Sequence, residues 1–319
     1  MTTADLNAAF AATLVDEWAR GRVTDACLAP GSRSTPLALA LDADPRIRVH
    51  VHLDERSAAF FALGAAKASG LPAVVLCTSG TAAANLHPAV LEAFHSRTPL
   101  IVATADRPPE LRHTGANQTV DQLGLFGGAA RFFCEVGVPE AVPGAGRYWR
   151  SIGARSLGAA LGPPAGPVHL NLAFREPFVS SDGQGGSTTE PGRSDGAPWT
   201  RSVPGASTLD PRALDELIEV VVASERGVVV TGWGAGCPGE VVERFAEAAG
   251  WPILADPLSG ARNGHLAIST YEALLRCPAF AAGHRPDLVV RLGASLTGRV
   301  SAEWLDASVR QVVMDPDGA

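Results

Sequence analysis

The chain has 319 residues, more than one typical hydrophobic core accommodates, and this length favours two domains. Hydrophobic residues make up 46% of the sequence and charged residues 18%, a balance that excludes a disordered or fibrous chain. The formal net charge of −7 and the lack of a basic stripe argue against nucleic-acid binding, whereas local arginines remain compatible with small anionic substrates.

The N-terminus and the cysteines point to a cytoplasmic protein. The first residues lack the basic start and apolar core of a signal peptide, and no apolar run is long enough to span a bilayer. The five cysteines are widely scattered and form no Cys-x-x-Cys pair, so we expect reduced thiols. No membrane contact is expected.

Strand and helix patterns alternate through the first half of the chain. Apolar residues recur at helical spacing from Leu6 to Trp18 and predict an N-terminal helix. The predicted strands are 25–29, 48–53, 73–77, 100–104 and 168–172, and predicted helices begin at Pro36 and cover 57–69 and 82–95. This alternation predicts right-handed crossovers and a mostly parallel sheet.

A second α/β pattern follows a segment, 180–206, that is rich in Gly, Ser, Pro and Asp and is predicted to be an exposed linker. The predicted helices are 211–223 and 240–249, and the predicted strands are 227–231, 252–255, 288–292 and 311–314. The sequence therefore predicts two doubly wound, mostly parallel-sheet domains, which cover residues 1–179 and 207–319.

An acid, Glu55, follows the predicted strand 48–53 and opens the next helix. An acid at the carboxyl end of a parallel strand faces the crevice where open α/β sheets bind ligands. Such an acid is more often structural than catalytic, but the neighbouring corners are polar as well. We therefore consider Glu55 a candidate for chemistry.

Polar corners follow the adjacent predicted strands. Arg33, after the first strand, can form a fork onto a carboxylate or phosphate, or it can pair with Asp54. The turn 78–81 precedes a helix, so its amides can hold an anion, or its hydroxyls can serve as ordinary helix caps. Asp106-Arg107 and Asn117-Gln118 supply further planar donors and acceptors.

Other patterns have structural explanations. His50 and His52 share one strand face without a neighbouring ligand cluster, so no metal site is expected in this chain. No Gly-x-Ser-x-Gly elbow is present, which argues against a serine nucleophile. The glycines 232, 234 and 236 follow a strand, but their spacing departs from the dinucleotide fingerprint, so either a nucleotide site or a tight turn fits.

Taken in order, the corners become specific: PGSRSTPL at 30–37, DER at 54–56, TSGTAAAN at 78–85, ADRP at 105–108 and GANQT at 115–119. They closely resemble the 2-succinyl-5-enolpyruvyl-6-hydroxy-3-cyclohexene-1-carboxylate synthase family, thiamine-diphosphate transferases of menaquinone biosynthesis. Members decarboxylate 2-oxoglutarate and add the succinic-semialdehyde carbanion equivalent to isochorismate in a 1,4 fashion. The resemblance covers the first domain and, more weakly, the second.

The resemblance implies roles for individual residues. Glu55 matches the acid that hydrogen-bonds N1′ of the cofactor's aminopyrimidine, and a carboxyl shielded from water would have a raised pKa suited to this task. The other implied cofactor-binding residues are Pro30, Gly31, Thr78 and Ser79, and the implied substrate-binding residues are Ser32, Arg33, Arg107, Asn117, Gln118 and, in the second domain, Arg299.

The resemblance also implies Mg²⁺ and a homodimer or homotetramer whose active site lies between subunits. Family members carry a third domain that binds Mg²⁺ and the diphosphate through a Gly-Asp-Gly segment and a downstream asparagine, and nothing in this sequence matches it. We therefore expect an N-terminal fragment that lacks the diphosphate-binding domain and is inactive alone.

Three alternatives stay open. The chain can belong to another thiamine-diphosphate carboligase or decarboxylase, such as an acetohydroxyacid synthase. It can be a non-catalytic nucleotide-binding module that uses the glycine-rich corner. Three arginines, Arg97, Arg276 and Arg299, can also form an effector pocket for an acid, although the sequence gives no geometry for one.

Overall fold

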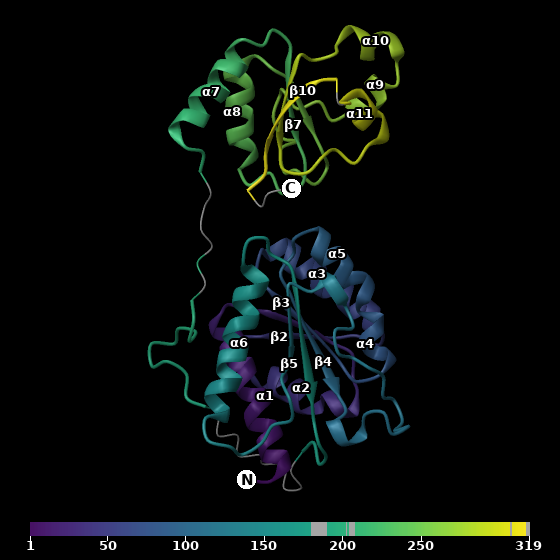
Figure 1. Ribbon diagram of the computed structural model, residues 1–319, viewed down its shortest axis with the longest axis vertical. Coiled ribbons are helices and arrows are strands. Elements are labelled where there is room, and N and C mark those ends of the chain that lie inside the picture. The colour runs from purple at the N-terminus through teal and green to yellow at the C-terminus, as the bar shows by residue number, and fades with distance from the viewer. Residues whose placement is uncertain (180–189, 202, 204–207, 307, 317–319) are drawn as a thin grey trace. The chain divides into compact units, whose positions relative to one another are not determined.

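The computed structural model describes residues 1–179, 190–201, 203, 208–306 and 308–316. The chain forms two compact units, Met1–Pro204 and Gly205–Ala319. Each is an open sheet of parallel strands with helices against it (Figure 1), which confirms the predicted α/β class. None of the described helices is both long and apolar enough to cross a membrane.

The first unit contains a six-stranded sheet in the order β2-β1-β3-β4-β6-β5, with every neighbouring pair parallel. Its strands are β1 (Asp25–Leu28), β2 (Arg48–Val51), β3 (Ala73–Cys77), β4 (Leu100–Asp106), β5 (Phe132–Glu135) and β6 (Pro167–Ala173). The residues of β3, β4 and β6 are all buried, as expected of inner parallel strands covered on both faces. The edge strands β2 and β5 are only partly covered.

Helices cover both faces of this sheet (Figure 1). They are α1 (Thr3–Arg20), α2 (Thr35–Ala43), α3 (Glu55–Ser69), α4 (Thr81–Asn85), α5 (His87–His95) and α6 (Ala145–Leu161). One core cluster joins the sheet to α1, α2 and α6, and another joins it to α3, α4 and α5. The helix predicted over 82–95 is interrupted because Pro88 lies in the first turn of α5, where its missing N–H suits a helix start.

Part of the predicted linker 180–206 packs against the first unit. Residues 180–189, 202 and 204–206 lie outside the described residues. The backbone N–H of Glu190 donates to Thr13 Oγ1 at 3.2 Å, and the N–H of Trp199 donates to Glu17 Oε1 at 2.5 Å. Residues 190–199 therefore contact α1 rather than extending freely into solvent.

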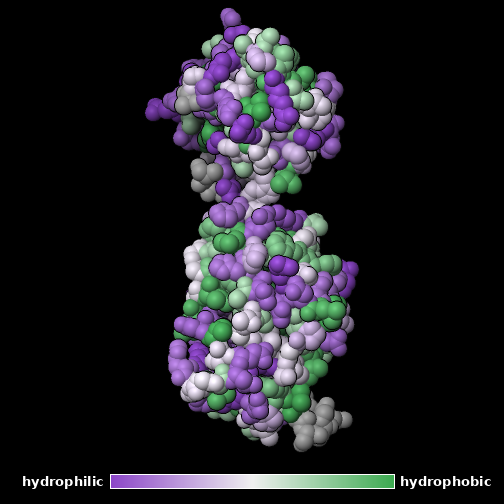
Figure 2. All heavy atoms as spheres, turned by 90° about the vertical axis from the view of Figure 1, so that its right-hand side faces the viewer, coloured by the Kyte–Doolittle hydropathy of each residue, from purple (hydrophilic) through white to green (hydrophobic). Residues whose placement is uncertain are grey.

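The second unit contains a four-stranded parallel sheet in the order β10-β9-β7-β8. Its strands are β7 (Gly227–Thr231), β8 (Ile253–Ala255), β9 (Leu288–Leu292) and β10 (Arg310–Met314). Its helices are α7 (Pro211–Val222), α8 (Gly239–Ala249), α9 (Tyr271–Leu275), α10 (Pro278–Gly283) and α11 (Arg299–Trp304). Two core clusters pack on its two faces. Figure 2 shows hydrophilic and hydrophobic residues intermixed on the visible surface of each unit.

Candidate active site

The strand order of the first unit gathers the predicted corners. Strands β2, β1, β3 and β4 are successive neighbours and all parallel, so their carboxyl ends share one edge of the sheet. The segments that follow them carry Glu55, the corner 30–33, the turn 78–81 and Asp106-Arg107. This is the edge where open parallel sheets bind ligands.

Glu55 is the first residue of α3, which is capped by the side chain of Asp54 accepting from Ser57 N at 2.9 Å. The Glu55 carboxylate is half-buried and makes no hydrogen bond or ion pair with any residue that the structure describes. The expected shielding of the Glu55 carboxyl from water is incomplete in the single chain, because Glu55 follows β2, an edge strand of the sheet. Burial, and secondly the nearby charge of Glu55, raises the pKa of the Cys77 thiol.

The corners at 30–33 and 78–81 touch each other. A Cβ atom on Gly31 would lie 2.3 Å from Cβ of Thr78, so only glycine permits this approach. Thr78 and Ser79 are buried, whereas Pro30 and Ser32 are exposed. Gly31 and Thr78 therefore bring the corners after β1 and β3 into direct contact.

Arg33 is buried, with 5% of its surface exposed. Its guanidinium donates to Phe174 O at 2.5 Å, pairs with Glu176 at 3.3 Å and lies over the Phe178 ring at 4.9 Å. The pairing with Asp54 that the sequence allowed is therefore wrong, since Asp54 caps α3. The Nε atom of Arg33 is buried without a hydrogen-bond partner among the described residues.

Arg107 brings a second buried guanidinium to the same place and donates to Ser79 Oγ. Burial, and next the positive charge of Arg107, lowers the pKa of Arg33. Two cations held close together in a partly dry environment repel each other unless an anion lies between them. The pair is thus suited to a carboxylate-bearing ligand.

The loop that follows contributes Asn117 and Gln118, which are both exposed. Gln118 Nε2 donates to Ser79 O at 3.1 Å, so it reaches the same turn as Arg107. The residue before α4 is Gly80, and no side chain caps that helix, so the capping explanation for Ser79 and Thr81 is wrong.

A buried polar network that sequence reasoning missed lies beneath these corners. Gln122 accepts from Gly80 N at 2.9 Å and donates to Ala105 O at 3.2 Å and to Asn171 Oδ1 at 2.8 Å. Asn171 in turn donates to Asp106 Oδ2 at 2.8 Å. The only signal in the sequence was the pair His169 and Asn171, which share one face of an otherwise apolar strand.

Asp106 is the buried acid at the end of β4. Burial raises its pKa, although the Asn171 hydrogen bond and the charge of Arg112 oppose this effect. Arg112 lies 2.9 Å from Asp106 and 2.7 Å from Glu135. A cavity of about 180 Å³ opens beside these groups; its lining includes Asp106, Arg112, Thr119 and Gln122 but neither Asn117 nor Gln118.

Arg299 belongs to the second unit, where it opens α11. Its side chain is 88% exposed and lies 3.5 Å from Glu303. The structure therefore brings Arg33, Arg107, Thr78, Ser79 and Gln118 together in the first unit, and it gives Arg299 only a surface ion pair.

The glycine-rich corner of the second unit serves close packing. A Cβ atom on Gly232 would lie 1.9 Å from Ala294 O, which belongs to the segment after β9. Asp256, at the end of β8, accepts from Thr297 Oγ1 and Leu258 N, both at 2.9 Å. These contacts favour the tight-turn alternative over a nucleotide site.

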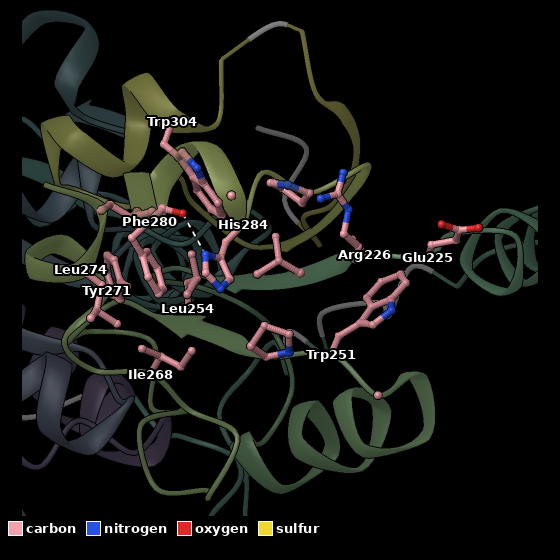
Figure 3. A pocket seen from close by; sticks show the side chains of 17 residues that line it. Glu225, Arg226, Trp251, Leu254, Ile268, Tyr271, Leu274, Phe280, His284 and Trp304 are labelled. Carbon is pink, nitrogen blue, oxygen red and sulfur yellow. Dashed lines mark hydrogen bonds between the residues drawn. The ribbon is translucent and has the colours of Figure 1, made fainter. Parts of the chain in front are cut away.

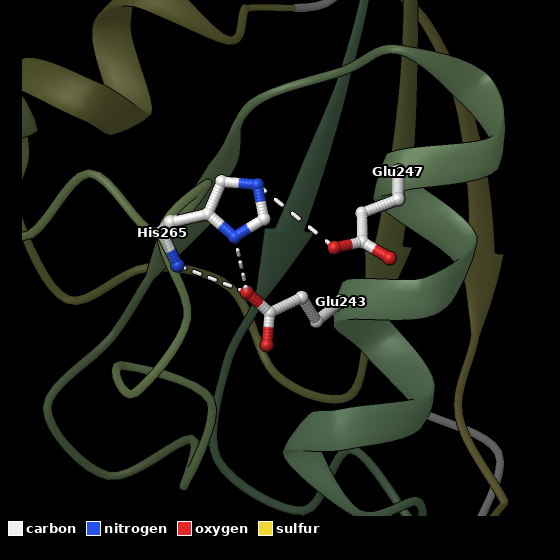
Figure 4. Close-up of side chains that lie close together, drawn as sticks. All are labelled: Glu243, Glu247 and His265. Atoms are coloured by element: carbon white, nitrogen blue, oxygen red, sulfur yellow. Dashed lines mark hydrogen bonds and ion pairs between the residues drawn. The ribbon is translucent and has the colours of Figure 1, made fainter.

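One group of three side chains in the described part of the chain has metal-ligating chemistry: Glu243, Glu247 and His265 (Figure 4). His265 Nδ1 lies 3.1 Å from Glu243, and its Nε2 lies 3.9 Å from Glu247. Each ring nitrogen thus faces a carboxylate, and the His265 backbone N–H donates to Glu243 at 2.9 Å, so contacts within the chain account for the group. The only local signal in the sequence is the four-residue spacing of the two glutamates on α8.

Comparison with known proteins agrees with the site. The model of the N-terminal TPP binding domain of thiamine pyrophosphate enzymes matches residues 8–125, and the model of the thiamine pyrophosphate middle domain matches residues 193–313. The first match lies within the first unit, and the second begins at residue 193, near the end of that unit, and covers most of the second unit.

Curated relatives extend over nearly the whole chain. The 2-succinyl-5-enolpyruvyl-6-hydroxy-3-cyclohexene-1-carboxylate synthase of Thermobifida fusca is 53% identical over 97% of this chain and 54% of its own length. The synthases of Roseiflexus castenholzii and Geobacillus kaustophilus are 46% and 44% identical over 97% and 99% of this chain, and over 54% and 55% of their own lengths. The chain spans about half the length of these relatives, and it belongs to the 2-succinyl-5-enolpyruvyl-6-hydroxy-3-cyclohexene-1-carboxylate synthase family of thiamine pyrophosphate enzymes.

Proposed function

We propose that this chain supplies the pyrimidine-side half of an active site that joins 2-oxoglutarate, after its decarboxylation, to isochorismate by 1,4-addition. The observation that carries the proposal is the arrangement at one sheet edge of an acid with no partner among the described residues, Glu55, and two buried guanidiniums, Arg33 and Arg107. The names of the relatives support the same reaction.

The residues at this edge fit thiamine diphosphate. Glu55 offers a carboxyl without a hydrogen-bond partner among the described residues, and such a group can share a proton with a ring nitrogen of the cofactor. Pro30, Gly31, Thr78 and Ser79 would hold the aminopyrimidine beside it. When bound, the cofactor supplies the electron sink for decarboxylation.

The substrates would be held by charge and hydrogen bonding. Both are carboxylates, and guanidinium forks bind carboxylates in a fixed orientation. Arg33 retains an unused buried N–H at Nε, and Arg107 lies close enough for mutual repulsion, so a carboxylate between them would relieve both costs. Ser32, Asn117 and Gln118 would donate hydrogen bonds to the remaining oxygens.

We further propose that Mg²⁺ and a second subunit complete the site in a homodimer or homotetramer. Exposed apolar side chains flank Glu55 in the sequence: Val51 and Leu53 before it, and Phe60 and Phe61 on α3. Apolar groups of this size at one surface mark an interaction site. A covering subunit would also provide the shielding that Glu55 lacks in the single chain.

The test is consumption of 2-oxoglutarate and isochorismate by the native-length polypeptide that contains this sequence, with thiamine diphosphate and Mg²⁺. Glu55→Gln should lower turnover by about 100-fold or more, the usual contribution of a positioned acid or base. Glu216→Gln is the matched control, because Glu216 is exposed on α7. Full activity of Glu55→Gln would refute the role of Glu55, and consumption of pyruvate in place of 2-oxoglutarate would favour another thiamine-diphosphate carboligase.

A further inference from the structure

The second unit contains a cavity of about 320 Å³ at the amino ends of its strands (Figure 3). Gly227 and Val228 begin β7, Pro252 precedes β8 and Pro286 precedes β9, and all four line the cavity. The glycine-rich corner and Asp256 follow the carboxyl ends of β7 and β8, at the opposite edge of the same sheet. The cavity is therefore distinct from the crevice where a doubly wound sheet binds nucleotides.

Ring side chains form part of the cavity wall. Five rings line it: Trp251, Tyr271, Phe280, His284 and Trp304. Figure 3 shows Phe280 and His284 side by side, with Trp304 on one side of them and Leu254 and Ile268 on another. A volume of this size matches known small-molecule sites, and a wall of rings favours a planar occupant that stacks against them.

Two of the ring N–H groups donate hydrogen bonds to backbone carbonyl oxygens. Trp304 Nε1 donates to Ala281 O at 2.9 Å, and His284 Nδ1 donates to Phe280 O at 2.8 Å. The His284 ring also stacks on Phe280, with 4.0 Å between centroids. The wall therefore presents mostly apolar ring faces, and few of its side chains carry polar atoms.

Charge at the cavity is balanced. Its lining contains one acid, Glu225, and one guanidinium, Arg226, which are adjacent in sequence and both exposed. In Figure 3, both charged side chains lie to one side of the ring cluster, and Arg226 is nearer to it than Glu225. A charged ligand would lose its hydration here without gaining a buried counter-ion, and this cost selects against it.

We propose that this cavity binds an uncharged, planar aromatic molecule. Removal of the ring faces from water drives binding, since apolar burial stabilises by about 25 cal/mol per Å². The proposal is independent of the reaction at the first unit, because none of the lining residues belongs to that site.

The probe is phenylnaphthylamine, an uncharged dye with two flat ring systems whose fluorescence rises in apolar surroundings, titrated into the 319-residue chain. We expect saturable binding of one dye per chain. Its anionic sulfonate, anilinonaphthalene sulfonate, should bind at least about tenfold more weakly, a difference of about 1.4 kcal/mol. Equal or tighter binding of the sulfonate would overturn the assignment of an uncharged ligand.

The blocking variant is Gly283→Phe. Gly283 ends α10 and lines the cavity, and a Cβ atom there meets no other atom within 4 Å, so the new side chain has room. Dye affinity should fall at least about tenfold. The matched control is Gly64→Phe on α3, where an added Cβ also meets no atom within 4 Å, and it should leave affinity unchanged.

A second variant keeps the test valid if Gly283→Phe does not fold. Leu274→Trp narrows the same cavity from a position that is 38% exposed, and it should weaken the dye in the same way while the circular dichroism spectrum stays unchanged. Undiminished binding in a folded Gly283→Phe or Leu274→Trp variant would refute the site. Dye affinity that falls as protein concentration rises would also refute it, because the occupant would then be a second copy of the chain.

Discussion

Replacement of Gln122 by methionine is the sharpest test of the polar network beneath the candidate site. The change keeps the length of the side chain but removes its three buried hydrogen bonds, to Gly80 N, Ala105 O and Asn171 Oδ1. Each buried hydrogen bond contributes about 1 kcal/mol net, so we expect the free energy of unfolding of the first unit to fall by about 3 kcal/mol. The orphaned Gly80 N–H accounts for part of this loss.

Native-state hydrogen exchange measures this loss in one unit at a time. The amides of β4 are buried, so they exchange through large openings of the first unit, and a loss of about 3 kcal/mol should speed them about 100-fold. Gln118→Met is the matched control: this exposed glutamine makes one hydrogen bond, to Ser79 O, and should change exchange by less than about fivefold. A change below fivefold in Gln122→Met would refute the reasoning.

Two further predictions concern titratable groups in the first unit. Thiol labelling near pH 8 should modify exposed Cys277 first and spare Cys27 and Cys77. Burial raises the pKa of both spared thiols, that of Cys27 to about 12, so few thiolates are present to react. Mass spectrometry of the labelled peptides measures this, and fast labelling of Cys77 in the folded chain would contradict it. Burial lowers the pKa of His169 from 6.5 to about 3. Between these two pH values the unfolded chain binds the proton and the folded chain does not, so the first unit should lose about 1.4 kcal/mol of stability for each unit by which the pH falls. Urea unfolding across this range should show a flatter slope in His169→Gln, and an unchanged slope would rule out His169 as the cause.

The inner strands could be predicted because their pattern is local. Continuous apolar runs gave β3 and β7 their observed bounds from sequence alone. The edge strand β5 was not predicted, since its four residues follow an irregular segment and show no alternation of their own. It becomes a strand by pairing with β6, which is a tertiary effect.

The site residues could be proposed from their corners, but their partners could not. Arg33 and Arg107 follow predicted strands, which placed them at the right edge of the sheet. The atoms that hold Arg33 belong to Phe174 and Glu176, more than 140 residues away, and no spacing in the sequence marks that contact. Gln122 likewise lies in a loop whose only local signal was polarity.

The position of β5 determines when this strand can pair during synthesis of the chain. Among the described strands, its only neighbour is β6, which comes later in the sequence, at Pro167–Ala173. At about 5–20 residues per second, a ribosome needs several seconds to move from one strand to the other. During that interval the pair Phe132-Phe133 has no strand to join, so the nascent chain carries an aromatic, unpaired segment of the kind that chaperones bind.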